Sequence, residues 1–149
     1  MEVKNLFDPV VKQEIIDRIN KLNPDSKVLW GKMNVAHMLA HCQMPIGIAL
    51  GSHTINGHWL MKLILPLFKK TLYDEKPYKH GLPTEKSFVM TGKIKDFETE
   101  KNQLLDMINH FTDANMINDK HPVFGKLSKE QWSKSSWKHL DHHLQQFGV

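Results

Sequence analysis

The spacing of apolar residues along the chain predicts helices. Between residues 9 and 22, apolar side chains recur every three or four positions, which is the spacing of one helix face. They are Val11, Ile15, Ile19 and Leu22. Asp8 and Pro9 precede this run, as an N-cap residue followed by the residue preferred at the first helical position. A helix is therefore expected from Pro9, and the turn residues Asn23-Pro24-Asp25-Ser26 end it.

A second helix is predicted from about Asn34 to Leu50, with Gly51-Ser52 as its end. Its apolar residues surround it nearly completely, which is typical of a buried helix. They include Val35, Met38, Leu39, Met44, Ile46 and Ile48. Pro45 lies inside this run and cannot donate to the carbonyl of His41, so a kink or loosened turn is expected at His41.

Two further main helices follow a long connection from Ser52 to Lys95. A loop of that length is expected to contain structure, and the apolar run predicts a helix from about Trp59 to Lys70. The third main helix should begin near Asp96. The fourth should begin at the capping box Ser128-Lys129-Glu130-Gln131 and run to about Gln146.

Four substantial helices without a convincing strand pattern predict an all-α fold. A chain of 149 residues is the size of one domain, so residues 1–149 are read as a single unit. The expected architecture is a four-helix bundle with a long crossover connection between the second and third main helices.

Composition narrows the classes of partner. The single cysteine, Cys42, excludes an internal disulfide, and no secretory signal is evident, so a cytoplasmic protein is expected. The apolar stretch from Trp59 to Phe68 is far shorter than the ~20 residues of a membrane span, so no membrane partner is expected. The net charge is +4, but Arg18 is the only arginine and the lysines are scattered. No nucleic-acid partner is expected.

Histidines carry the candidate chemistry. The chain has ten, and three are close together at positions 139, 142 and 143. At about 100° per residue, His139 and His143 share one side of the last helix with Trp132, Leu140 and Leu144. The opposite side carries Lys134, Lys138, Asp141, His142 and Gln145, so His142 is read as a surface residue. His139 and His143 are four apart, the spacing that lets two imidazoles on one helix reach one metal ion.

The second helix offers His37 and His41, again four apart, as the source of a third ligand. The residues alone do not choose between them. The alternative is that each histidine is a hydrogen-bonded core residue, and for His37 alone this alternative is favoured. Cys42 points about 100° away from His41 on a helix, so it is not expected to share the ligand position. The other histidines, at 53, 58, 80 and 110, are assigned no role.

Three segments together resemble a known family. The first runs from Trp30 to Cys42 and contains the candidate ligands His37 and His41. The second runs from His121 to Leu127, just before the last predicted helix. The third is the C-terminal run from Trp137 to Val149, which contains His-Leu-Asp-His-His-Leu-Gln-Gln-Phe-Gly. The chain resembles the DinB-like superfamily, and more closely a branch of it known only as a domain of unknown function. The resemblance implies a four-helix bundle with a metal site made by His41, His139 and His143. It thereby favours His41 over His37.

Function is expected to follow from this site. Three imidazoles leave a divalent ion (zinc, nickel, iron or manganese) with an open position, which is typical of catalytic sites. Relatives in the superfamily include metal-dependent thiol transferases, so a transferase using a low-molecular-weight thiol, or a hydrolase acting on a small molecule, is one hypothesis. A metal-binding or stress-response protein without turnover is the second. The third is an interaction module that forms a homodimer through Trp59–Phe68.

Overall fold

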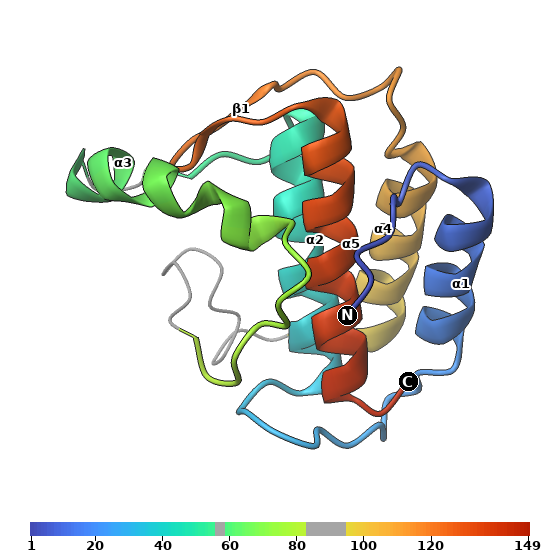
Figure 1. The fold of residues 1–149 in the computed structure, drawn as a ribbon. Coiled ribbons are helices and arrows are strands. Elements are labelled where there is room, and N and C mark those ends of the chain that lie inside the picture. Colours follow the sequence, from blue (N-terminus) through green and yellow to red (C-terminus); the bar gives the residue numbers. More distant parts are fainter. Residues whose placement is uncertain (56–58, 83–94) are drawn as a thin grey trace.

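The computed structural model describes residues 1–55, 59–82 and 95–149, and these are mostly helical. The four longest helices are α1 (Pro9–Asn20), α2 (Val35–Leu50), α4 (Phe97–His110) and α5 (Lys129–Gln146). They lie side by side, with α2 against α4 and α5, and α1 against the other side of the same two helices (Figure 1). The prediction of an all-α fold is confirmed at this level.

The predicted helix starts are confirmed by their capping bonds. Asp8, Asn34, Asp96 and Ser128 all occupy N-cap positions, and the side chain of each accepts a backbone N–H of the first turn. At α5 the capping box is complete. The Gln131 N–H donates to Ser128 Oγ at 3.2 Å, and the Ser128 N–H donates to Gln131 Oε1 at 2.9 Å. Two donors that no helical carbonyl can reach are thus satisfied.

The most buried helix is α2, as its apolar sequence predicts. Twelve of its sixteen residues are buried, among them Met38, Leu39 and Ile48. The helix continues through Pro45 without interruption, and the loosened turn expected at His41 stays a prediction. It ends at Gly51, whose φ of +77° is a left-handed conformation that glycine adopts without a steric penalty.

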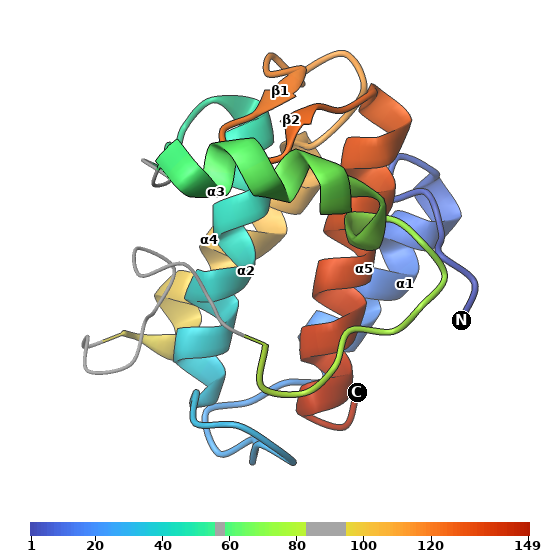
Figure 2. The same cartoon turned by 60° about the vertical axis from the view of Figure 1, so that its left-hand side comes forward.

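The long connection between α2 and α4 contains the predicted helix, in two parts. These are α3 (Trp59–Ile64) and the 3₁₀ helix η1 (Leu65–Leu72), which crosses the face of α5 (Figure 2). The change of helix type has a cause in Pro66, which has no N–H to donate to the carbonyl of Lys62. The later part of the connection, residues 83–94, lies outside the described residues. Among the described helices, none is long and apolar enough to traverse a bilayer.

One short strand pair departs from the expectation of no strands. β1 (Lys120–His121) pairs antiparallel with β2 (Gly125–Lys126), with His121 opposite Gly125. Strands of two residues are too short to show an alternating pattern in the sequence. The pair lies immediately before α5 in the chain.

Candidate metal centre

Two neighbouring helices bring three histidines together. His41 comes from the middle of α2, and His139 and His143 come from successive turns of α5. One ring nitrogen from each histidine lies within 4.8 Å of the other two. The Nε2 atoms of His41 and His139 are 3.0 Å apart. Residues almost one hundred positions apart in sequence therefore converge on one point.

The three rings form a nearly equilateral group. The ring centroids of His41 and His139 are 4.9 Å apart, those of His41 and His143 are 4.7 Å apart, and those of His139 and His143 are 4.6 Å apart. The spacing of four residues along α5 accounts for the third distance, since residues four apart are neighbours on a helix surface. The other two distances depend on the packing of α2 against α5.

Burial keeps the imidazoles of His139 and His143 neutral. His41 and His143 are buried, and His139 is half-buried. Burial lowers the pKa of His143 to about 3, helped by the neighbouring His41. Burial also holds the pKa of His139 well below its usual value, and the other histidines add to the effect. A neutral imidazole has the free lone pair that metal coordination requires.

Gln146 completes the surroundings of His143. Its Oε1 atom lies 2.9 Å from His143 Nδ1, and its Nε2 atom donates to the Trp30 carbonyl at 2.6 Å. A histidine that ligates a metal through one nitrogen commonly donates its other N–H to such an oxygen. The sequence reasoning missed Gln146, although a glutamine three residues after a candidate ligand lies on the same helix face.

The structure brings together the three histidines that the sequence reasoning proposed as ligands. His37 is half-buried one turn earlier on α2 and does not belong to the group whose ring nitrogens converge. Cys42 is also outside it. Burial raises the pKa of its thiol, and its Sγ lies 3.6 Å from Met38 Sδ. Cys42 is thus a small buried residue, as expected.

The opposite side of α5 is less exposed than the helical wheel predicted. Lys138 is 1% exposed, and Asp141 is buried as well. Lys138 forms an ion pair with Asp74 at 2.8 Å, and Arg18 forms one with Asp141 at 2.7 Å. The wheel was wrong here because buried charges are tolerated when they find partners, and both partners come from distant parts of the chain.

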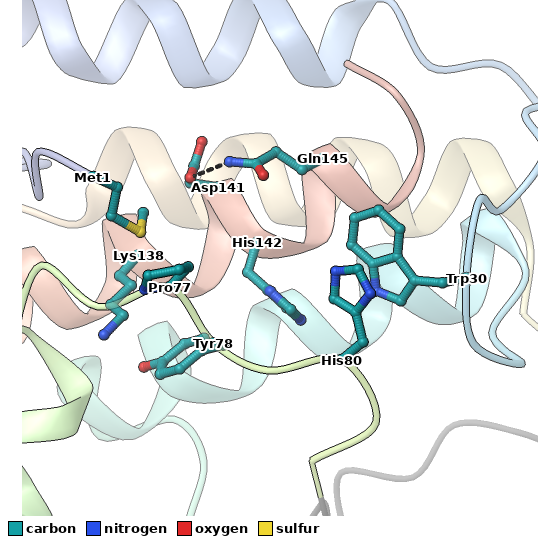
Figure 3. Close-up of a pocket in the computed structure, with 9 residues that line it drawn as sticks. All are labelled: Met1, Trp30, Pro77, Tyr78, His80, Lys138, Asp141, His142 and Gln145. Carbon is teal, nitrogen blue, oxygen red and sulfur yellow. Dashed lines mark hydrogen bonds between the residues drawn. The ribbon is translucent and has the colours of Figure 1, made fainter.

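His142 is also half-buried, which corrects its reading as a surface residue. Its ring meets Tyr78 edge-on at 5.6 Å and Trp30 at 6.1 Å, and His80 stacks on Trp30 at 4.0 Å. These four rings line a cavity of about 60 Å³ on the outer face of α5 (Figure 3). A second cavity, of about 240 Å³, lies between η1 and residues 76–82. No pattern in the sequence indicated that residues 73–82 would cover α5.

The chain matches the model of a known protein family. The family described as Protein of unknown function (DUF1569) matches residues 10–148, so the chain belongs to it. All three histidines of the site lie within the matched region. No curated protein and no solved structure matches the chain.

Proposed function

We propose that this protein holds one divalent metal ion through His41, His139 and His143, within a DinB-like four-helix bundle whose long α2–α4 connection is the crossover. The observation that carries the proposal is the convergence of three ring nitrogens within 4.8 Å. The donor set fits zinc, nickel, iron or manganese, because imidazole is a suitable ligand for each.

A structural role without metal is the competing explanation. A hydrogen bond between His41 Nε2 and His139 Nε2, at 3.0 Å, satisfies two of the three rings. A hydrogen bond joins only two nitrogens, however, whereas three converge here. His143 moreover meets Gln146 through Nδ1, which leaves its Nε2 as the nitrogen available to a metal. The third ring therefore favours a shared ion.

We further propose metal-dependent chemistry on a small molecule, either thiol transfer with a low-molecular-weight thiol or hydrolysis. A bound divalent ion with an open position supplies Lewis acidity and lowers the pKa of a water or thiol placed there. The chain's own contribution is positioning. Gln146 holds the proton on His143 Nδ1, and His139 is the least buried of the three histidines. The resemblance to the superfamily with thiol transferases supports this activity.

A metal-binding or stress-response protein without turnover is the second candidate. One observation favours it, namely that the two cavities described above are lined by residues other than His41, His139 and His143. A substrate cavity beside the metal would favour the enzyme.

Metal analysis of the purified protein tests the site. The expected content is one divalent ion per chain in the wild type and a strong loss in His41→Ala, with His53→Ala as a control on an unrelated histidine. A wild type that binds no divalent ion after reconstitution would overturn the proposal. A screen of the metal-loaded protein with thiols and electrophiles then separates the two candidates. Turnover that is present in the wild type and lost in His41→Ala would show that the protein is a metal-dependent enzyme.

A further inference from the structure

The segment formed by α3 and η1 is an apolar arm on the surface of the protein. Seven of its large apolar side chains are between 38% and 81% exposed. They are Trp59, Leu60, Met61, Leu63, Ile64, Leu67 and Phe68. No residue of either helix is buried, and α3 projects away from the four main helices (Figure 1). Exposed apolar surface gathered in this way usually marks an interaction site.

The arm is anchored to the protein through η1. Leu65 and Leu72 of η1 and the following Tyr73 pack against the hydrophobic core, and η1 contacts α5. The exposed residues are thus not a detached helix but a fixed projection. Their exposure leaves the core intact, so an external surface can cover them without any unfolding.

The distribution of apolar residues around α3 indicates what covers it. At about 100° per residue, the five apolar residues span an arc of about 200°, and Lys62 occupies the opposite side. A helix that packs on one protein neighbour typically has an apolar stripe of about 100°. An arc twice as wide suits a medium that surrounds the helix, such as the boundary of headgroups and acyl chains in a bilayer.

The charges of the arm favour an anionic surface. Residues 59–73 include Lys62, Lys69 and Lys70 and no acidic residue. A second copy of the arm would offer the same lysines and no acidic residue to compensate them. Anionic lipid headgroups compensate them instead, and lysine stems reach such headgroups while their neighbours insert.

We propose that this arm docks the protein on the surface of a membrane rich in anionic phospholipid. Trp59 and the exposed leucines, Leu60, Leu63 and Leu67, enter the interface, and Lys62, Lys69 and Lys70 meet the headgroups. The expectation of no membrane partner rested on the lack of a spanning segment, which docking at the surface does not require. The proposal is independent of the metal site.

Flotation of the full-length protein with vesicles tests it. Wild-type protein should float with vesicles of phosphatidylcholine and phosphatidylserine, much less with phosphatidylcholine alone, and less at high salt, because salt screens the lysines. Leu63→Asp and Leu67→Asp should each weaken binding by about tenfold or more, since each removes a leucine from the interface. Lys62→Glu and Lys70→Glu should each weaken binding to vesicles that contain phosphatidylserine by roughly fivefold or more, and should leave binding to phosphatidylcholine vesicles unchanged.

The control is Ile117→Asp, which introduces the same charge at an apolar residue that is 70% exposed outside the arm. It should bind as the wild type does. Loss of binding in the control, equal binding of the Leu67→Asp variant, or no binding of the wild type to either vesicle would each overturn the proposal. One further result would overturn it. If light scattering shows that the wild type is a dimer and that Leu67→Asp is a monomer, and vesicles capture neither protein, then a second copy of the chain covers the arm.

Discussion

Gln146 connects the imidazole of His143 to the backbone of Trp30. The amide nitrogen of Gln146 is 2.6 Å from the Trp30 carbonyl, an acceptor, so the amide oxygen must face His143. That oxygen is 2.9 Å from His143 Nδ1, which therefore carries the proton. The Nε2 atom of His143 is left with its lone pair, on the side where His41 and His139 converge.

Removal of this hydrogen bond should weaken metal binding without removing a ligand. We expect Gln146→Leu to lower the affinity for a divalent ion about 10- to 100-fold, because the second bond of a ligating histidine orients its ring and raises its basicity. Titration calorimetry with zinc measures the affinity. Gln146→Glu keeps an acceptor at His143 Nδ1 and should restore part of the loss.

The matched control is Gln145→Leu, since Gln145 is exposed and adjacent. Its metal affinity should stay at the wild-type level. If Gln146→Leu and Gln146→Glu bind zinc with the same affinity as each other, and both have a lower melting temperature than the wild type, then Gln146 only supports the fold.

The adjacent residues His142 and His143 should behave differently when each is truncated. We expect His143→Ala to abolish stoichiometric metal binding, because its ring belongs to the converging group. His142→Ala should leave the metal content nearly intact and cost about 1 kcal/mol of folding stability, as its ring loses its contacts with Trp30 and Tyr78. Metal content and thermal unfolding of both variants check this.

Retained metal in His143→Ala, combined with loss in His142→Ala, would mean that α5 presents its other face to α2. That outcome requires Leu140 and Leu144, each 1% exposed, to leave the core. Each would forfeit roughly 1.5–3 kcal/mol.

The sequence predicted what depends on local pattern. The capping residues Asp8 and Ser128 are where the pattern placed them, and the pair His139 and His143 shares a face because four residues make about one turn. The choice of His41 over His37 came from a family resemblance, and in the structure His41 is the one that converges with the pair.

The sequence could not predict what depends on distant partners. Lys138 looks like a surface lysine until Asp74 is known to lie beside it, 64 positions away. The same is true of His142, whose neighbours Trp30 and Tyr78 come from two separate loops. A helical wheel assigns polar residues to solvent. It fails here because the irregular segment around Asp74 covers α5, and its backbone carbonyls and carboxylate accept hydrogen bonds from a buried lysine.

Acid should destabilise the metal-free protein partly through His121, a buried histidine outside the metal site. Burial lowers its pKa to about 4, from about 6.5 when unfolded. The folded state therefore resists protonation. No stability is lost above about pH 6.5. As the pH falls below that value the folded state loses stability, and the loss reaches its limit of about 3 kcal/mol near pH 4.

His121→Asn should reduce this acid sensitivity. The asparagine oxygen can accept the N–H groups of Val123 and Phe124 that His121 Nδ1 accepts now, at 3.2 and 3.3 Å, and it does not titrate. Urea unfolding in a chelator, at pH 7.5 and at pH 4.5, gives the loss of stability for each chain. An equal loss in the two chains would show that His121 is protonated without cost.

Removal of the buried Lys138 should cost considerable folding stability. Its Nζ donates to the carbonyls of Thr71 and Asp74 at 2.7 and 2.9 Å and to the Asp74 carboxylate at 2.8 Å. Lys138 also lies over the ring of Tyr78, at 4.4 Å from its centroid. Lys138→Met leaves a carboxylate and two carbonyls facing an apolar group, so we expect a loss of about 3 kcal/mol in the free energy of unfolding.

Asp74→Asn should cost less, about 1 kcal/mol, because the two carbonyls and an amide oxygen still accept from Lys138. In the double variant the loss should be smaller than the sum of the two single losses, since neither charge remains unpaired. Urea unfolding of the four chains measures this coupling. Additive losses would contradict the ion pair, and a Lys138→Met variant as stable as the wild type would mean that residues 71–78 cover α5 without the help of Lys138.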